Sequence, residues 1–484
     1  MSGRRAPAVL LLAAFLVLIG LFHALTLRPG HDWGDDFAQY IHHAKNIALG
    51  IDYNRTGYLW NPSFPMLGPQ TYPPVFPLIL APVYAVAGLD LTAMKLVVVL
   101  FFVAAILMTF LVFRGMLRGY ELAVLLPLLG LNPYFWRLKD NVLSDLPFFF
   151  FVYLALFLFQ RRPEPGRLDA RAVAHAVACG VVCYLAYGTR SLGAILIPSL
   201  LLTDWIRWRR ITLASVVSTI VFAALAIAQA AVSHHDTSYT SILSLDPRRI
   251  ATNGWEYARY LSGLWDNVWW KHADIVLTLL AAALAVAGIW GRLRSGASVL
   301  EIFAVLYGLA ILPWIATQGR YLVPLMPLYL AYAILALRSL SIRWPRFAGG
   351  ASMVLLALAC VGFASVYGST SWRRPPEGVG THNARAMFAA VSRMTEPGAV
   401  VIFQKPRALA LFTDRQASGV QDAPPPELLR YLRRLGAAYV LLGPDDRVFL
   451  HQEALRNLIT AFPDRFVAIY RNPEFALFRV RGLS

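Results

Sequence analysis

Long apolar runs recur over the first three quarters of the chain, separated by short gaps that are rich in arginine. A membrane-spanning helix needs about 20 predominantly apolar residues, and a shorter run suffices where flanking residues or neighbouring helices shield it. The runs therefore predict a polytopic α-helical membrane protein with about 11 transmembrane helices, in a range of roughly 11 to 13. They are Ala8–Leu25, Thr92–Phe113, Leu122–Trp136, Leu146–Phe159, Ala172–Tyr187, Leu192–Leu202, Ile211–Val232, Ile275–Trp290, Val299–Thr317, Tyr321–Leu337 and Phe347–Tyr367.

Two apolar segments can be interpreted in more than one way. The first run follows Arg4 and Arg5, as in a signal peptide, but it is long for one and no small-x-small cleavage site follows. We therefore predict an uncleaved first helix. The segment Tyr72–Gly88 is apolar but contains four prolines, and as a full span it would invert every later loop. We interpret it as a juxtamembrane or half-inserted segment; a true span, compensated elsewhere, is the alternative.

The positions of the arginines predict which side of the membrane each loop occupies. Short cytoplasmic loops are enriched in Lys and Arg, and alternate gaps of this chain hold sixteen arginines. This places the N-terminus in the cytoplasm, and it places the first outer loop (residues 26–72), the gap Ser233–Asp274 and the tail on the other side. The arginines are Arg4, Arg5, Arg114, Arg118, Arg161, Arg162, Arg167, Arg171, Arg207, Arg209, Arg210, Arg292, Arg294, Arg338, Arg343 and Arg346.

The pattern changes after Tyr367, where long apolar runs end and short strand-like runs alternate with helical patterns. This order predicts that residues 368–484 form a small extracytoplasmic α/β domain, after a transmembrane domain of residues 1–367. The expected strands are Ala399–Phe403, Tyr439–Leu442, Phe466–Tyr470 and Ala476–Val480, and the expected helices are Glu427–Leu435 and Glu453–Phe462.

Composition supports a membrane protein and excludes a disordered chain. Hydrophobic residues make up 58% of the chain and charged residues 15%, against about 45–50% and about 25% in soluble domains. The net charge of +17 would suggest nucleic acid in a soluble protein. Because most of the excess lies in the gaps assigned to the cytoplasm, we expect membrane lipids and no nucleic acid as partners.

Two adjacent carboxylates begin the first outer loop's helix. Apolar residues recur at helical spacing from Phe37 to Ala48, and Gly50 would end that helix. Asp35 and Asp36 stand at its start, where a carboxylate caps free N–H groups and is favoured by the helix dipole. One carboxylate is enough for a cap, so a pair at a membrane surface is also a candidate catalytic group.

Three more ionisable residues are predicted to lie on the same face of the membrane. Asp145 stands at the first turn of an apolar helix, either as a helix start or as a functional group. Arg190 and Arg320 interrupt two apolar hairpins, either reaching to lipid headgroups or clamping a phosphate, which guanidinium binds bidentately. Paired acids beside phosphate-binding arginines suit the transfer of a group from a phosphate leaving group.

The order of these motifs resembles the GT-C superfamily of integral-membrane glycosyltransferases, in particular the bacterial branch with protein O-mannosyltransferases and the aminoarabinose transferase of lipid A. The resemblance covers nearly the whole chain. It rests on the pair Asp35-Asp36, TYPPVFPLILAPVYAVAG from Thr71, SDLPFFFFVYLALFLF from Ser144, YGTRSLGAILIPSLLL from Tyr187, GRYLVPLMPLYLAYA from Gly319, GAVVIFQKPRALALFTDRQAS from Gly398 and AAYVLLGP from Ala437.

The resemblance implies an inverting enzyme that moves a sugar from a polyprenyl-phosphate donor to a lipid, glycan or protein acceptor. It implies that Asp35 or Asp36, with Asp36 favoured, is the general base. Asp145 would orient the substrate or a divalent cation, which would be the protein's cofactor. Arg320 and Arg190 would bind the lipid phosphate. The setting would be the bacterial inner membrane, with the tail domain periplasmic or extracellular.

Several neighbours of these residues complete the predicted site. Tyr321, Lys139 and Tyr72 lie in the same loops and are further candidates for substrate binding. His42 is a candidate to join Asp145 as a metal ligand.

Two other functions remain as alternatives. A lipid or glycolipid transporter or flippase would need ionisable residues deep in its spans and internal repeats, whereas Lys95 is the main charge within a run and no repeat is visible. The second alternative is a non-catalytic membrane scaffold whose C-terminal tail binds partners.

Overall fold

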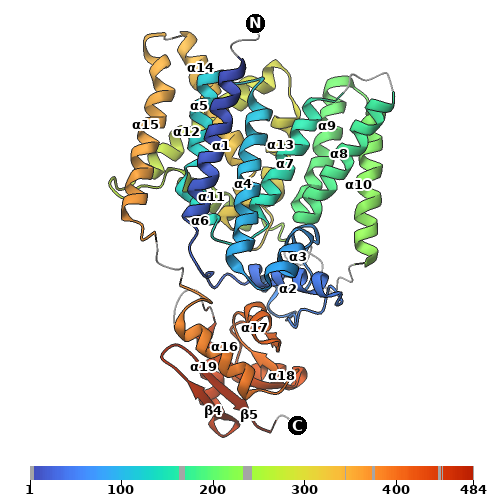
Figure 1. Cartoon of the computed structure of the whole chain (residues 1–484), viewed down its shortest axis with the longest axis vertical. Coiled ribbons are helices and arrows are strands. Elements are labelled where there is room, and N and C mark those ends of the chain that lie inside the picture. The colour runs from blue at the N-terminus through green and yellow to red at the C-terminus, as the bar shows by residue number, and fades with distance from the viewer. Residues whose placement is uncertain are drawn as a thin grey trace.

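The helices of the first three quarters of the chain stand side by side in a bundle, and a small α/β domain lies beyond one end of it (Figure 1). The computed structural model describes residues 5–162, 169–232, 243–343, 345–372, 377–444, 449 and 451–482. Each predicted run contributes one bundle helix. These helices are α1 (Arg5–Leu25), α4 (Leu91–Phe113), α5 (Gly119–Gly130), α7 (Asp145–Gln160), α8 (Ala170–Thr189), α9 (Leu196–Trp208), α10 (Leu213–Val232), α12 (Ala273–Ser295), α13 (Val299–Ile311), α14 (Met326–Arg343) and α15 (Pro345–Ser369).

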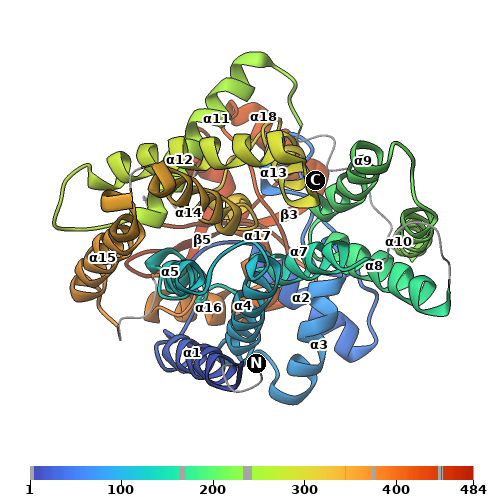
Figure 2. The ribbon, with the colours of Figure 1, turned by 90° about the horizontal axis from the view of Figure 1, so that it is seen from above.

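The bundle has the surface of a multi-pass membrane protein. Among the described residues, five helices are long and apolar enough to cross a membrane, namely α1, α4, α8, α10 and α12. Their outer faces expose large apolar side chains such as Leu10 (69%), Ile227 (68%) and Val286 (67%). Water would penalise so much exposed apolar surface, whereas lipid does not. The shorter helix α7 lies among its neighbours near the middle of the bundle (Figure 2), as expected for runs that need shielding.

The end of the bundle opposite the α/β domain holds the beginning of α1 (Figure 1). Several of the predicted cytoplasmic arginines lie in the last turns of α9, α12 and α14 or directly after α4 and α7. Three of them also neutralise buried carboxylates there. Arg338 lies 3.0 Å from Glu121, Arg292 lies 3.2 Å from Glu301, and Arg162 pairs with Asp204. Breaking a buried pair by removing one partner is costly. These arginines therefore hold helix ends together, in addition to any part they play in topology.

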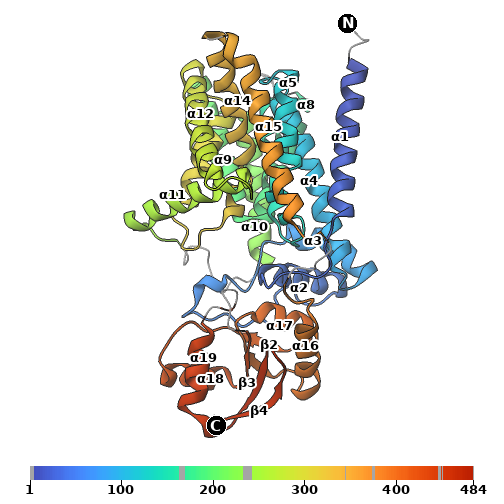
Figure 3. The same ribbon diagram turned by 90° about the vertical axis from the view of Figure 1, so that its left-hand side faces the viewer.

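Short elements cover the other end of the bundle. Helix α3 (Val75–Ala87), formed by the proline-rich segment, packs against α2 (Asp36–Leu49) rather than running through the bundle (Figure 3). Its 13 residues are too few to span the hydrocarbon core. The remaining elements here are η1 (Pro65–Leu67), α6 (Pro133–Leu138), η2 (Ser191–Ile195), α11 (Pro247–Leu261), η4 (Ser262–Trp265) and η5 (Gly319–Leu322).

The C-terminal domain is built on a five-stranded sheet in the order β2-β1-β3-β5-β4. Strands β2, β1 and β3 are parallel, and β5 is antiparallel to both β3 and β4. The elements are α16 (His382–Met394), β1 (Val400–Ile402), α17 (Pro406–Thr413), β2 (Gln416–Ser418), α18 (Pro425–Leu435), β3 (Ala437–Leu442), α19 (Gln452–Ala461), η6 (Pro463–Arg465), β4 (Phe466–Arg471) and β5 (Ala476–Val480). The four predicted strands are present; β2, with the sequence Gln-Ala-Ser, is too short and polar for its pattern to predict a strand.

The first outer loop packs into this domain instead of standing apart from it. Trp33, only 5% exposed, lies among Phe388, Phe403, Phe449 and Phe475, with ring centroids 5.1–6.2 Å away. The backbone of the loop also extends the sheet at its edge strand, β2. Tyr58 of the loop forms a parallel bridge with Ala417 of β2, whose other side pairs with β1. The domain is thereby fastened to α2, which begins two residues after Gly34.

Candidate active site

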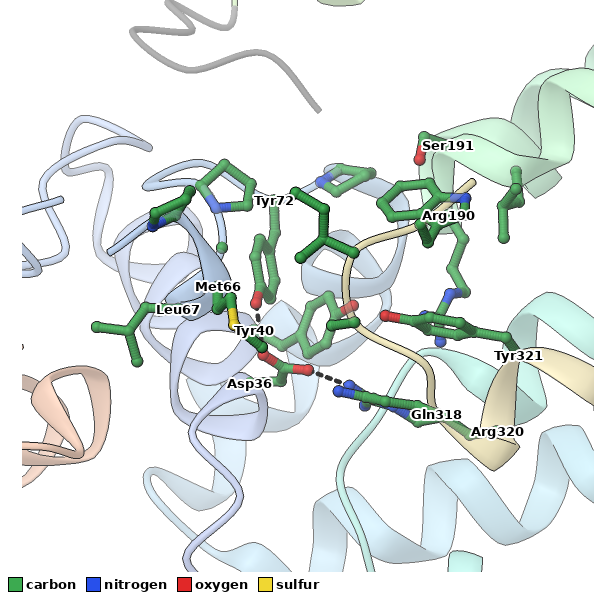
Figure 4. A pocket seen from close by; sticks show the side chains of 18 of the residues that line it. Asp36, Tyr40, Met66, Leu67, Tyr72, Arg190, Ser191, Gln318, Arg320 and Tyr321 are labelled. Carbon is green, nitrogen blue, oxygen red and sulfur yellow. Dashed lines mark hydrogen bonds and ion pairs between the residues drawn. The ribbon is translucent and has the colours of Figure 1, made fainter. Parts of the chain in front are cut away.

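A pocket opens where the end of the bundle nearer the C-terminal domain meets the first outer loop (Figure 4). Three stretches of chain form its wall, from α2 and the loop after it, from the turn between α8 and α9, and from the turn before α14. The polar side chains on the wall are Asp36, Tyr40, Tyr72, Thr189, Arg190, Ser191, Gln318, Arg320 and Tyr321.

Asp36, in the first turn of α2, is the carboxylate that faces this pocket (Figure 4). It pairs with Arg320, lies 3.1 Å from Nη1 of Arg407, and accepts a hydrogen bond of 2.5 Å from the Tyr72 hydroxyl. Burial alone would raise the pKa of this carboxyl, but the two guanidinium groups and the Tyr72 hydrogen bond together hold the pKa well below its usual range. The carboxylate therefore stays ionised throughout the neutral range.

Asp145 extends the same cluster from the start of α7. It pairs with Arg190 at the end of α8, and its second oxygen lies 3.6 Å from Nη1 of Arg320. The Arg190 guanidinium also lies over the ring of Tyr321, 5.0 Å from its centroid. The two arginines thus bind protein carboxylates, so the alternative in which they only reach to lipid headgroups does not describe them.

The charges form one alternating row, Arg407–Asp36–Arg320–Asp145–Arg190. Three cations and two carboxylates leave a net charge of +1 in a place with little solvent. On the pocket wall itself, the cations Arg190 and Arg320 stand beside the carboxylate Asp36. Guanidinium groups are the side chains best shaped for phosphate oxygens.

Asp35 points away from the pocket, into the C-terminal domain. Its two oxygens accept hydrogen bonds from the backbone N–H groups of Arg407 (3.3 Å) and Ala408 (3.0 Å), in the first turn of α17. It makes no side-chain capping bond to α2 itself. The expectation that the pair caps its own helix is therefore wrong for Asp35, which caps a helix of another domain. Burial outweighs nearby Arg407 and Lys405 and raises the pKa of the Asp35 carboxyl.

The remaining predicted residues divide between the pocket and other places. Tyr72 and Tyr321 line the pocket. Lys139 is fully buried away from that wall, where it donates to the carbonyl of Thr26 (2.9 Å) and pairs with Asp140 (3.1 Å). That side chain secures the beginning of the first outer loop to the bundle.

His42 is buried on the side of α2 near Lys45 and Asp414, and it is not part of the pocket wall. Burial, aided by Lys45, lowers the pKa of its imidazole to about 4. No group of three or more His, Cys, Asp or Glu side chains that could hold a metal ion occurs in the described part of the chain. Asp145, flanked by two guanidinium groups, offers a poor donor set for a cation. The divalent cation stays a prediction.

Reasoning from the sequence did not single out Arg407, Tyr40 or Gln318. Tyr40 lines the pocket and shares a hydrogen bond of 2.8 Å with Ser144, and Gln318 accepts from Arg320. The spacing Asp36–Tyr40 places both on one face of α2, which is a local signal for the tyrosine. No local pattern marks Arg407, because its partners lie more than 330 residues away.

The chain has the fold of a multi-pass membrane protein with a C-terminal α/β domain, and this fold is shared with solved structures of GT-C enzymes. A scan against protein-family models gives no match, and neither does a search of the curated proteins. Solved structures, in contrast, match over nearly the whole chain.

Structures of GT-C glycosyltransferases illustrate the match. The structure of ArnT from Cupriavidus metallidurans bound to undecaprenyl phosphate is similar over 99% of both chains, with 15% identity and a TM-score of 0.59. The Archaeoglobus fulgidus oligosaccharyltransferase, in complex with zinc and sulfate, matches over 88% of this chain and 67% of its own, with 14% identity and a TM-score of 0.59. The archaeal oligosaccharyltransferase AglB from Archaeoglobus fulgidus, in complex with an inhibitory peptide and a dolichol-phosphate, matches over 94% of this chain and 72% of its own, with 12% identity and a TM-score of 0.58. At these identities the comparison establishes the shared fold.

Proposed function

We propose that this protein is a glycosyltransferase that moves a pentose or hexose from a polyprenyl-phosphate donor to a hydroxyl of a lipid, glycan or protein acceptor. The observation that carries the proposal is the row of charges at the pocket, in which an ionised carboxylate stands beside arginines with a net charge of +1. Two proteins of the same fold support it, because their structures hold undecaprenyl phosphate and dolichol-phosphate.

In this proposal Arg320 and Arg190 bind the phosphate of the donor. Both guanidinium groups line the pocket, and Asp145 between them fixes their positions. As the bond from the sugar to the phosphate breaks, negative charge gathers on the phosphate oxygen, and preorganised cations stabilise that charge. Leu192, Trp314 and Ile315 on the same wall offer apolar contact to the first part of a prenyl chain.

Asp36 is the proposed general base. The acceptor hydroxyl oxygen attacks the anomeric carbon from the face opposite the phosphate, and Asp36 takes the hydroxyl proton. The bond between the anomeric carbon and the phosphate oxygen breaks, and its electron pair stays on the phosphate. The configuration is inverted. A phosphate that competes for Arg320 removes one cation from Asp36, so the pKa of the carboxyl rises toward the range in which a base is efficient.

The proposed setting is the inner membrane of a bacterium, with the pocket on its outer face. The support is the grouping of arginines in or next to the ends of α4, α7, α9, α12 and α14, whereas other turns line the pocket. The positive-inside rule assigns the arginine-rich turns to the cytoplasm.

The transporter alternative is less well supported. Lys95, the charge within an apolar run, donates hydrogen bonds to the backbone carbonyls of Arg28 (2.7 Å) and Gly30 (2.5 Å). Its ammonium group thus fastens the first outer loop to α4, and Lys95 does not line the pocket.

The test is sugar transfer in proteoliposomes with a panel of undecaprenyl-phosphate-linked pentoses and hexoses, read out as release of undecaprenyl phosphate. Asp36→Asn should reduce kcat by roughly 10²–10⁴-fold, the usual contribution of a general base. Arg137→Gln, which breaks the exposed pair Arg137–Asp266 near the same membrane face, is the control and should keep the wild-type rate. Wild-type turnover by Asp36→Asn would refute the assignment of the base. Movement of the lipid across the bilayer without sugar release would favour the transporter.

A further inference from the structure

One side chain of the cluster comes from the C-terminal domain. Arg407, in the first turn of α17, is 1% exposed although it carries a full charge. Its Nη1 donates to the Tyr72 hydroxyl (2.7 Å) and to Asp36 (3.1 Å), and its Nη2 donates to the carbonyl of Pro69 (3.1 Å). The two groups that define one side of the pocket, Asp36 and Tyr72, are therefore tied together by a residue of another domain.

The surroundings of the guanidinium leave it one position. The guanidinium carbon, Cζ, lies 4.7 Å from the ring centroid of Tyr58 and 4.9 Å from that of Tyr72. The guanidinium group is therefore in contact with two aromatic rings. Gly68 comes close enough that a Cβ there would lie 3.1 Å from Nη2. Its backbone has φ +81°, which other residues rarely adopt. The loop is thus shaped around the arginine.

Arg407 is held in this position because both ends of α17 are bound to side chains on or next to α2. Asp35 accepts from the N–H groups of Arg407 and Ala408 at the start of α17, and Lys45 lies 2.5 Å from Asp414 at its end. The two helices therefore run in the same direction, in contact along their length. The adjacent carboxylates Asp35 and Asp36 thus have separate tasks, since one holds the helix and the other receives its arginine.

We propose, on the basis of the function proposed above, that Arg407 is a positioning residue for the catalytic base, so that the C-terminal domain is part of the catalytic unit. Arg407 does not line the pocket, and both of its terminal nitrogens are engaged by protein groups. It acts through Asp36, by holding Oδ1 together with Tyr72 while Oδ2 faces Arg320. The acceptor hydroxyl then meets a carboxylate of fixed orientation.

The experiment compares Arg407→Lys and Arg407→Gln with the wild type in the transfer assay, measuring kcat, the KM for donor and the pH profile of kcat/KM. Positioning predicts a fall in kcat with an unchanged KM, because the donor phosphate does not meet Arg407. Without the cation at 407 the pKa of Asp36 rises, so the acidic limb of Arg407→Gln should move to higher pH, by about 1–3 units. Lysine keeps the charge but cannot bridge Tyr72, Asp36 and Pro69. The acidic limb of Arg407→Lys should therefore match that of the wild type. Its kcat should lie between those of the wild type and Arg407→Gln.

The control is Arg415→Gln, at the other end of the same helix. Arg415 bonds only within the C-terminal domain, to Ser392, Thr395 and Thr413. It should leave the pH profile in place even where stability falls.

Each other outcome has a defined meaning. A rise in KM alone would make Arg407 a donor-binding residue, and a loss of kcat without a shift of the acidic limb in Arg407→Gln would make it merely structural; either overturns the proposal. Should the glutamine variant not fold, the lysine variant decides, because an unchanged kcat there contradicts positioning. If instead Asp36→Asn is fully active while these variants are not, the proposed base is at fault rather than Arg407.

Discussion

The row Arg407–Asp36–Arg320–Asp145–Arg190 shows how charges in a membrane protein depend on one another. Each carboxylate lies between two guanidinium groups, and Asp145 is 2% exposed. Desolvation makes each charge expensive by itself, and the pairing offsets that cost. Removing one member therefore affects stability through the partners that it leaves behind.

The pair Asp145–Arg190 provides a test of this dependence. Asp145→Asn leaves the Arg190 charge buried without its carboxylate, and we expect a loss of about 3–5 kcal/mol in the free energy of unfolding. The double variant Asp145→Asn/Arg190→Gln should recover most of this loss, since it removes one charge of each sign and leaves the row with the same net charge as in the wild type. Thermal unfolding in detergent, followed by tryptophan fluorescence, measures both. The exposed pair Arg137–Asp266 is the control, where Arg137→Gln should cost below about 1 kcal/mol; equal losses for Asp145→Asn and Arg137→Gln would contradict the coupling.

At the scale of elements, α2 is the helix that joins the two domains. Consecutive residues on a helix point about 100° apart. Asp36 consequently faces the pocket, while Asp35 faces α17. The loop after α2 contributes Tyr58, Gly68 and Tyr72 around Arg407. The geometry of the candidate site therefore depends on a loop whose backbone needs a glycine at one point.

Two glycines of this region have left-handed backbones but different surroundings. Gly68→Ala adds a Cβ 3.1 Å from Nη2 of Arg407, whereas Gly50→Ala, at the end of α2, adds one with nothing within 4 Å. Gly50→Ala, in the left-handed helical region, should cost about 1–2 kcal/mol through backbone strain. Gly68→Ala, with φ +81° and ψ +172°, lies in a region that is almost exclusive to glycine and should cost about 1–3 kcal/mol. Only Gly68→Ala should also reduce the transfer rate, because it displaces Arg407. Equal rates for the two variants, measured on folded protein, would show that the loop tolerates the shift.

At the scale of the whole molecule, the two ends of the bundle carry different elements. The beginning of α1 lies at one end, and α2 and the C-terminal domain lie at the other (Figures 1 and 3). The pocket is formed by α2, the loop after it and two turns of the bundle. A polyprenyl phosphate has its headgroup at a membrane surface and its tail in the bilayer. A pocket at the end of a lipid-exposed bundle is suitably placed for such a molecule.

The orientation in the membrane is testable by reporter fusions. A fusion after Arg210, between α9 and α10, should report cytoplasm, and a fusion after Tyr367, near the end of α15, should report the outer side. The physical reason is retention of arginine-rich short loops on the cytoplasmic side. Alkaline phosphatase and green fluorescent protein, active on opposite sides, provide the readout. The reverse pattern at both positions would invert the assignment of the pocket to the outer face.

The sequence by itself determined the helices of the bundle, the α/β character of the tail, and the presence of Asp36, Asp145, Arg190 and Arg320 near one membrane face. These are properties of run length, periodicity and charge placement, which are local in the chain. Tertiary structure alone decided which carboxylate faces the pocket, that Lys139 and His42 lie elsewhere, and that Arg407 completes the row. Asp36 and Arg407 are 371 residues apart, and only the packing of α17 on α2 brings their charges into contact.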